Sequence, residues 1–343
     1  MRSRIPIITL TLTLALAGTP GEGSAQDLHF SQFHEAPLTR NPALAGLFSG
    51  DYRIQGVYRN QWNTISFPYQ TGSLNAEFKR ALANGDDYLT MGLQMLYDRA
   101  GTVALTTSQF LPAVNFHKSL SQDRNTYLSV GMMGGLVSRR LDRSKVTTNS
   151  QFDGFDYNGS LPDGEAFTAG YTFFDASVGM SLYSTLGAEE QHQFFIGGAL
   201  HHFTRPVNAF YRNINHLPKW VLSAGFRLNI GPVSYLTFQH DAMIQTPYRQ
   251  QLSGVLYSHL LDPENEQGQT ISVGSMVRWG DAVIPMVKFD LKPLSLGFSY
   301  DVTVGRLASI ARGKGGFEIS VAYTGFRNSD RSARYAVRCP GGF

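Results

Sequence analysis

"LSLGFSYDVTV", residues 294–304, alternates apolar and polar side chains along its whole length. In an extended chain, successive side chains point to opposite faces, so Leu, Phe, Tyr and Val share one face and the small or polar residues share the other. This period of two predicts a β-strand with one apolar face. A tilted strand needs about 9–11 residues to cross a bilayer, whereas strands of soluble proteins average about 5–6 residues. The run 294–304 is as long as a membrane-spanning strand.

The same alternation recurs along the chain. Residues 219–229 (KWVLSAGFRLN) and 317–325 (FEISVAYTG) alternate cleanly, and residues 52–62 (YRIQGVYRNQW) do so less cleanly. We count about fourteen candidate strands, since each such run is bounded by turn residues. They begin near Tyr52, Tyr69, Tyr88, Thr102, Thr126, Thr172, Gln191, Lys219, Val233, Gln251, Thr270, Ala282, Leu294 and Gly316.

Alternation alone does not separate a packed soluble sheet from a membrane barrel. Strand length, strand number and aromatic placement favour the barrel, because Tyr and Trp recur at strand ends as in an interfacial girdle. The residues in question are Tyr52, Trp62, Tyr88, Tyr97, Tyr127, Trp220, Trp279 and Tyr323. We therefore predict an all-β, transmembrane, antiparallel β-barrel over residues 51–326.

The connections agree with a barrel of even strand number. The long connections Arg139–Gly170, His202–Pro218 and Gly305–Gly315 all follow odd-numbered candidate strands. The short turns NIGP (229–232) and DLKP (290–293) follow even-numbered ones. Outer-membrane barrels have long outside loops and short periplasmic turns, and with an even number of strands both termini of the chain are expected in the periplasm.

The N-terminus has the features of a secretory signal. Arg2 and Arg4 precede an apolar stretch, and Gly23-Ser24-Ala25 fits a cleavage site, so we predict a signal peptide at residues 1–25. No later run of about 20 apolar residues predicts a membrane-spanning helix. Residues 327–343 are expected to form a periplasmic tail. That tail holds Cys339, the single cysteine of the chain, which therefore forms no internal disulfide.

Residues 26–50 are too polar to span a membrane and too irregular for a strand. Such a segment can plug the lumen, where barrel groups or water satisfy its backbone, or it can hang in the periplasm as a docking site. A plain tether would leave apolar side chains such as Phe30, Phe33 and Leu38 in solvent. The charged residues on polar strand faces predict a lumen held by ion pairs and hydrogen bonds, or else a surface that gives selectivity or docks the plug. They are Arg53, Arg59, Arg227, Asp301 and Glu318.

Several motifs together resemble one known family. "FSQFHEAPLTRNPALAG" (30–46) followed by "YRNQW" (58–62) resembles the start of the PorP/SprF outer-membrane proteins of the Bacteroidetes type IX secretion system. Residues 149–167, 201–206 (HHFTRP), 297–307 and 315–323 are similar to later family motifs in the same order. The ending "RCPGGF" resembles the family's Cys-Pro ending, although Gly341 and Gly342 stand where an Arg is usual.

This resemblance implies a FadL-like or porin-like barrel in the outer membrane that serves type IX secretion or gliding motility. It implies three partners: outer-membrane lipid, a secreted surface protein with a C-terminal sorting domain, and periplasmic components of the machine. A passive porin or FadL-like transporter of small hydrophobic molecules is the alternative. The partner-contact candidates carried by the motifs are Phe30, Gln32, Asn41, Pro42, Gly46, Tyr58, Arg59, Gln61, Trp62, Gln151, Asp153, Tyr300, Asp301, Glu318, Cys339 and Pro340.

No motif for catalysis or for a cofactor is present. HExxH, paired CxxC, G-x-S-x-G and phosphate-loop patterns are all missing from the sequence, and scattered Lys and Arg predict no nucleic-acid partner. On a strand, His201 and His202 would point to opposite faces and could not easily share a metal ion. A pair of loop histidines could bind a metal ion, but solvated loop residues are the favoured interpretation. The acidic residues of 153–165 suggest calcium ligands, but their spacing fits no EF-hand, and a polar outer loop is the favoured interpretation.

Overall fold

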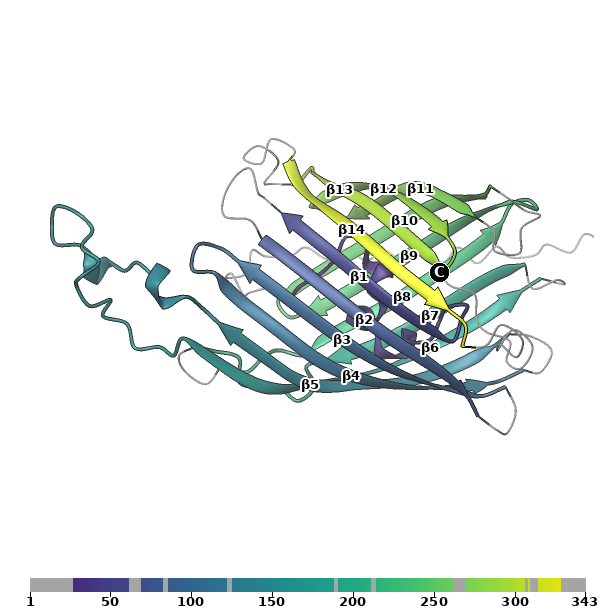
Figure 1. The fold of residues 1–343 in the computed structure, drawn as a ribbon, viewed down its shortest axis with the longest axis horizontal. Helices are drawn as coiled ribbons and strands as arrows, with labels where there is room; N and C mark the ends of the chain where they lie inside the picture. The colour runs from purple at the N-terminus through teal and green to yellow at the C-terminus, as the bar shows by residue number, and fades with distance from the viewer. Residues whose placement is uncertain are drawn as a thin grey trace, which may run out of the picture.

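Fourteen antiparallel strands close into a barrel in the computed structural model, which describes residues 27–61, 69–82, 86–121, 125–187, 191–210, 214–261, 269–305, 308 and 314–327 (Figure 1). The strands are β1 (Tyr52–Gln61), β2 (Tyr69–Ala81), β3 (Tyr88–Ala100), β4 (Leu105–Ser119), β5 (Tyr127–Arg140), β6 (Gly170–Leu186), β7 (His192–His201), β8 (Lys219–Asn229), β9 (Ser234–Gln245), β10 (Tyr248–Leu260), β11 (Thr270–Arg278), β12 (Ala282–Leu291), β13 (Leu294–Thr303) and β14 (Lys314–Gly325). Short helices precede β1, namely η1 (Phe33–Glu35), α1 (Pro37–Arg40) and η2 (Pro42–Leu44), and two more, η3 (Arg143–Lys145) and η4 (Asn149–Gln151), follow β5. The predicted barrel is confirmed.

Each strand pairs with its neighbours in sequence, and the ring is closed by the first and last strands. β1 pairs with β14 from Tyr52 opposite Gly325 to Gln61 opposite Gly316. The seam between them leaves no free sheet edge, so every backbone group at membrane depth can find a partner in the wall. No helix in the described part of the chain is long and apolar enough to cross a membrane.

The predicted strand starts agree closely with the observed ones. The largest differences are Thr102, where β4 begins at Leu105, and Gln251, where β10 begins at Tyr248. β4 begins later because Gly101 and Ala104 have φ angles of 68° and 49° and form a turn. Such left-handed residues interrupt a strand, and β-propensity alone does not reveal them.

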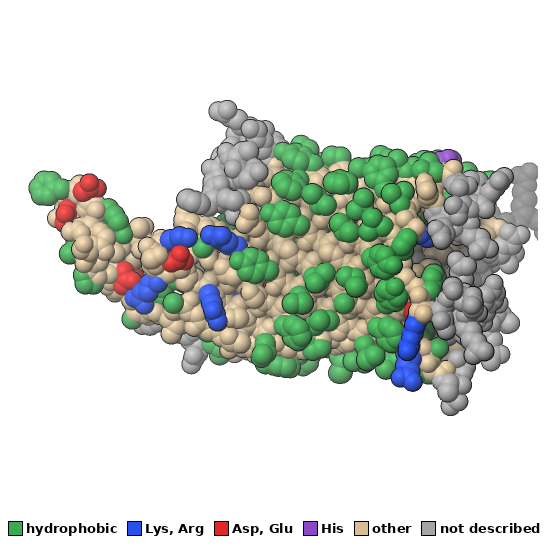
Figure 2. Space-filling model, in the orientation of Figure 1, with side chains coloured by type: hydrophobic (Ala, Val, Ile, Leu, Met, Phe, Trp, Pro, Cys, Tyr) green, Lys and Arg blue, Asp and Glu red, His purple; other side chains and the backbone are tan. Residues whose placement is uncertain are grey.

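The two faces of the wall differ as the alternation predicts. On β13, Phe298 and Tyr300 are each 44% exposed on the outside, whereas Ser299 and Asp301 are buried inside. Figure 2 shows hydrophobic side chains spread over the central band of the wall, with Lys and Arg confined to its two ends. This band matches the lipid-facing surface of a membrane barrel.

The aromatic girdle is only partly confirmed. Tyr97, Trp220 and Trp279 are more than half exposed on the outer surface. Tyr88 and Tyr127 instead point inward and are 2% and 1% exposed, so their assignment to the girdle is wrong. They pack with Leu44 and other apolar groups in the lumen, because the segment before β1 places an apolar partner there.

The long connections lie at one end of the barrel. The segment 141–169 projects far beyond the wall (Figure 1). It does so at the end of the barrel opposite to the one where β14 finishes, at Gly325. The described parts of the connections after β7 and β13, residues 202–210, 214–218 and 304–305, follow odd-numbered strands and so lie at the same end. By the rule for outer-membrane barrels this end is the outer mouth, and the end that carries Tyr52 and Gly325 is periplasmic.

Residues 27–50, here called the plug, lie inside the barrel. Every residue from Phe30 to Phe48 except Thr39 is buried. The plug begins at the outer mouth, where Asp27 contacts His202, and it ends at the periplasmic side, where the amide of Asp51 donates to the carbonyl of Gly325. The sequence allowed two places for this segment, the lumen or the periplasm, and in the structure it lies in the lumen.

The lumen is less polar than strict alternation predicts. Phe33 packs on Leu252, Ile284 and further apolar residues of β10 to β12. Leu38 packs on Leu111 and further apolar residues of β4 and β5. These inward patches receive the apolar side chains of the plug and keep them from water, which stabilises the filled lumen.

Glycines of the wall make room for the plug. A Cβ atom at Gly179 would lie 1.9 Å from Oδ1 of Asn41, and one at Gly131 would lie 2.5 Å from the carbonyl carbon of Pro42. Neither contact can be relieved by a flexible side chain end, because Asn41 and Pro42 are themselves enclosed. The wall and the plug are therefore fitted to each other at these positions.

We predict that Gly179→Val displaces the plug from its seat. Arg40 is the only Lys or Arg in residues 27–50, so trypsin can cut the plug at one place. Cleavage after Arg40 should be slow in the wild-type protein and fast in the variant. Gly72→Val is the matched control, because a Cβ there meets nothing within 4 Å. Equal protection of Arg40 in both variants, with both barrels folded by heat-modifiable gel migration, would contradict the fit.

Candidate functional site

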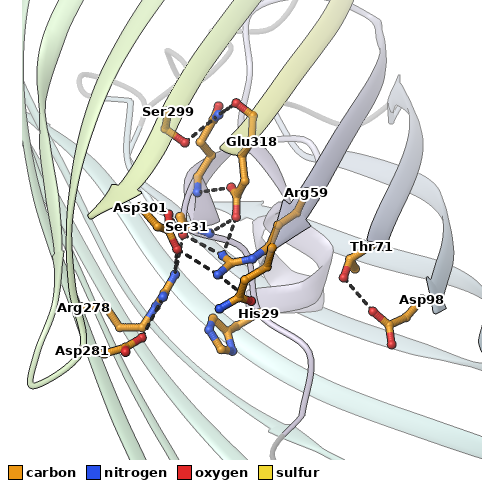
Figure 3. Close-up of polar contacts among 12 residues, drawn as sticks. His29, Ser31, Arg59, Thr71, Asp98, Arg278, Asp281, Ser299, Asp301 and Glu318 are labelled. Atoms are coloured by element: carbon orange, nitrogen blue, oxygen red, sulfur yellow. Dashed lines mark hydrogen bonds and ion pairs between the residues drawn. The ribbon is translucent and has the colours of Figure 1, made fainter. Parts of the chain in front are cut away.

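The plug is held at the seam by a buried charge network, here called the seam clamp (Figure 3). Arg59 of β1 lies opposite Glu318 of β14 in the strand register, and its Nη1 donates to Oε1 of Glu318 at 2.6 Å. Nη2 of Arg59 donates to Asp301 of β13 at 2.8 Å. The clamp thus joins the first strand to the last two across the closure.

Backbone amides of the plug complete the clamp. The N–H groups of Ser31 and Gln32 donate to the two carboxylate oxygens of Glu318 at 2.6 and 2.7 Å. The Ser31 hydroxyl donates to Asp301 at 2.7 Å. Charge-assisted bonds of this kind are stronger than neutral ones, and they satisfy donors that the irregular plug cannot satisfy by itself.

A second arginine balances the charge of the clamp. Arg278 of β11 donates to Asp301 at 3.0 Å, to Asp281 at 2.9 Å and to the Ser31 hydroxyl. Two buried cations, Arg59 and Arg278, therefore face two buried anions, Asp301 and Glu318. A buried charge is tolerated only when it is paired and hydrogen-bonded, and here each one is.

The middle of the plug is anchored on the opposite wall. Arg40 makes a bidentate pair with Asp241 of β9, with both N···O distances at 2.6 Å. The Asn41 side chain donates to the carbonyls of Met180 and Gly198 at 3.1 and 3.2 Å and accepts from the amide of Ala43 at 2.8 Å. The bond from Ala43 caps the start of η2, so the side-chain amide of Asn41 both begins this helix and binds the wall.

The periplasmic end of the plug has its own anchor. The amide of Gly46, whose φ is 86°, donates to Glu77 of β2 at 2.7 Å. Asn115 of β4 donates to the carbonyls of Ala43 and Ala45 at 2.9 and 2.8 Å. A Cβ atom at Gly46 would lie 2.1 Å from the Thr90 hydroxyl, so both backbone angle and space require glycine there.

A cavity of about 810 Å³ lies above the plug at the outer mouth, and we call it the vestibule. Its floor is formed by Asp27, Leu28 and His29 of the plug. Its wall carries aromatic, apolar and charged side chains from the outer ends of many strands. Among them are Tyr69, Asp98, Val103, Gln109, Arg139, Phe173, Tyr248 and Arg249. Thr71 donates to Asp98 at 2.6 Å within this wall (Figure 3).

A histidine cluster lies in the floor of the vestibule. His202 lies within 2.8 Å of Asp27 through Nε2 and within 2.6 Å of Asp175 through Nδ1. His202 has a φ of 57°, a left-handed angle that ends the strand alternation, so both His201 and His202 are buried on the inside. The expectation of opposite faces is therefore wrong, because β7 ends at His201.

The protonation of this cluster follows from its charges. Burial alone would lower the pKa of His202, but the Asp27 and Asp175 carboxylates raise that pKa to about 9, and the ring is cationic at neutral pH. Burial and the nearby charge of His202 lower the pKa of His216 to about 4, so its ring is neutral. The two rings stack with centroids 4.0 Å apart.

The outer loop uses its acidic residues as turn caps. Asp153 accepts from the amides of Asp156 and Phe155, both at 3.0 Å, and these donors lower the pKa of Asp153. Gln151 closes the capping box of η4 with Thr148. Phe155 is 97% exposed at the turn. Among the described residues, no group of three potential metal ligands forms in this loop.

The structure brings together most of the candidates that the motifs carry. The residues that meet in the lumen are Phe30, Gln32, Asn41, Pro42, Gly46, Arg59, Gln61, Asp301 and Glu318. Tyr58 and Tyr300 point to the outer surface, and Gln151 and Asp153 lie in the outer loop. Trp62, Cys339 and Pro340 lie outside the described residues.

Sequence reasoning missed several anchors of the plug. Arg40, Arg278 and Glu77 make buried ion pairs, yet none was singled out. Asp241 and Glu77 are charged residues in the middle of strands, and this signal was available. The sequence did not reveal which residues they pair with, because the plug contacts strands up to hundreds of positions away in the chain.

Comparison with solved structures yields outer-membrane barrels of low identity. The Ralstonia pickettii toluene transporter TbuX is 10% identical, with a TM-score of 0.46, over 84% of this chain and 92% of that one. A deltaS2 mutant of the TodX monoaromatic hydrocarbon channel is 10% identical, with a TM-score of 0.45, over 84% and 93%. CdiB from Acinetobacter baumannii is 8% identical, with a TM-score of 0.40, over 80% and 60%. No curated protein sequence matches the chain.

One family accounts for nearly the whole chain. Its sequence profile, described as "Type IX secretion system membrane protein PorP/SprF", matches residues 22–323. That range includes the plug, the outer loop and all strands except the end of β14. A closed barrel with a lipid-facing apolar band places the protein in the outer membrane. The chain belongs to the PorP/SprF family of type IX secretion system membrane proteins.

Proposed function

We propose that this barrel holds an exported surface protein at its outer mouth and contacts the periplasmic type IX machine at its other end. The observation that carries the proposal is the combination of a vestibule open to the outside with a plug that fills the lumen beneath it. The vestibule offers about 810 Å³ with mixed apolar and polar walls, a volume within the range of ligand-binding pockets. A chain segment of a client protein can enter it and stop at Asp27 and His29.

The plug argues against a passive transporter, the alternative that the sequence left open. Asp27 to Gly50 runs from the outer mouth to the periplasmic end, and its polar groups are bonded to the wall at the clamp, at Asp241 and at Glu77. A steady pore would require all three anchors to break. A small hydrophobic molecule that crossed the lumen would have to pass these buried ion pairs.

The periplasmic contacts are proposed on different ground. The periplasmic ends of β1 and β14 carry Asp51 and Arg327, whose amide donates to the Asp51 carboxylate at 2.8 Å. The predicted tail, residues 327–343, begins at this point. A partner on the periplasmic side would therefore meet the tail and the base of the plug together, and the gliding or secretion machinery is the partner class that the family implies.

We predict that deletion of residues 26–46 opens the barrel and abolishes partner capture. The wild-type protein should show no steady conductance in planar bilayers, whereas the truncated protein should show discrete steps. Partners should be lost from the purified complex at the same time. Steady conductance of the wild type, with normal protein export in a gene deletion strain, would instead support the transporter.

We predict that Arg59→Met loosens the plug by leaving the buried Glu318 carboxylate without a cation, whereas Asp301 keeps its pair with Arg278. Breaking one partner of a buried ion pair costs roughly 3–5 kcal/mol in unfolding free energy. Urea unfolding in detergent and trypsin cleavage after Arg40 measure the effect. Arg80→Met is the control, because Arg80 is exposed on β2. Equal stability of the two variants would show that the clamp does not hold the plug.

We predict that Gln109→Trp, which fills the vestibule, releases the client from the cell surface. The client is first defined as the surface protein lost from cells of the gene deletion strain. In the Gln109→Trp strain it should still be exported but should appear in the medium. Ser108→Trp on the outer face of the same strand is the control. Retention of the client by the Gln109→Trp strain would exclude the vestibule as the holding site.

A further inference from the structure

Three potential metal ligands meet in the vestibule floor, apart from the seam clamp. Asp27 comes from the plug, whereas His202 and His216 come from the connection between β7 and β8. One ligand atom from each lies within 4.8 Å of the other two. Within the described ranges, no other group of His, Cys, Asp or Glu residues meets this condition.

His202 is oriented as a ligand would be. Its Nδ1 lies 2.6 Å from the carboxylate of Asp175, which leaves Nε2 directed at Asp27 at 2.8 Å. A carboxylate that binds the far nitrogen of a histidine is the usual second layer of a zinc site, where it fixes the ring and raises its basicity. The left-handed backbone of His202 places the ring in this position.

His216 has no hydrogen bond from its ring. Nδ1 is buried without a partner, and Nε2 lies 3.6 Å from Oδ1 of Asp27, too far for a hydrogen bond. The backbone nevertheless fixes the residue, since the His216 amide donates to the Pro206 carbonyl at 2.7 Å and Val207 pairs with Asn215. A buried nitrogen without a partner is unfavourable, and a bound ion would offset this cost.

The separations suit a tetrahedral ion. With Zn–N and Zn–O bonds of about 2.0–2.1 Å, two ligand atoms of a tetrahedral site lie about 3.4 Å apart. The two distances from Asp27 to the imidazole nitrogens, 2.8 and 3.6 Å, bracket this value. Because the two rings stack with their planes 15° apart, binding of the ion requires the His216 ring to turn out of the stack until its nitrogen faces the same point as Nε2 of His202. The vestibule supplies an entry path and room for a water molecule as fourth ligand.

We propose that Asp27, His202 and His216 bind a zinc ion that fastens the start of the plug to the outer connection between β7 and β8. Two imidazoles and one carboxylate are a ligand set that favours zinc among divalent ions. The ion takes the place of the proton between His202 and Asp27. This proposal does not depend on which client the vestibule holds.

Lys219 is the competitor of the ion. Its Nζ lies 2.6 Å from Oδ2 of Asp27, so an ammonium group neutralises the same carboxylate when zinc is absent. Zinc must displace this contact or use the other oxygen. The replacement of Lys219 by a neutral side chain should therefore strengthen zinc binding, whereas a cluster that serves only as an ion-pair network would merely lose a partner.

The test is a calorimetric titration of the whole mature chain with zinc chloride at pH 8, in detergent and without a polyhistidine tag. One zinc ion per chain should bind. His216→Gln and Asp27→Asn should weaken binding more than about tenfold, and Asp175→Asn about 10–100-fold. Lys219→Gln should tighten it. His192→Gln is the matched control, since this ring lies at the periplasmic start of β7.

A second readout separates a true site from surface binding. Cobalt in place of zinc should give the strong visible absorption of tetrahedral coordination, and His216→Gln should remove it. Every variant is first checked for a folded barrel by heat-modifiable gel migration. The proposal is overturned if the wild type shows no saturable binding, or if His216→Gln and His192→Gln bind zinc with the same affinity.

Discussion

The pair formed by Arg59 and Glu318 is the interaction on which the rest of the structure depends. The pair spans the seam between β1 and β14, and two backbone amides of the plug donate hydrogen bonds to the same Glu318 carboxylate. Removal of either partner would leave a charge buried at membrane depth, where water does not compensate for it. The wall and the plug are therefore not separable parts. Closure of the ring and occupation of its interior are stabilised by the same bonds.

Much of the wall could be predicted from the sequence, because the alternation of apolar and polar residues predicts which side chains point outward and which point inward. Asp301 and Glu318 were expected in a lumen of ion pairs, and there they lie. Alternation does not state which inward residues meet around the ring. The partnership of Arg40 with Asp241 therefore required the closed structure. Tyr88 was misassigned for the same reason, since its partner belongs to the plug.

The two ends of the molecule have different physical characters. The outer mouth holds a cavity, a long projecting loop and a cluster of histidines, whereas the periplasmic end is packed with tyrosines and apolar plug residues. The proposed retention of a client would need this asymmetry, because a recess must face the client and a seal must preserve the permeability barrier. Nonpolar patches inside the wall provide the seal where a water-filled porin would have charged groups.

The path of the plug also constrains how the protein is made. Asp27 lies at the outer mouth, yet Asp51 joins β1 at the opposite end, so the segment runs the whole height of the ring. A ring that had already closed would have to draw this segment through its narrow, glycine-lined interior. Biogenesis is simpler if the sheet curls around the segment and β14 zips onto β1 as the final step. The outer-membrane insertion machinery would then release a barrel that is sealed from its first moment in the bilayer.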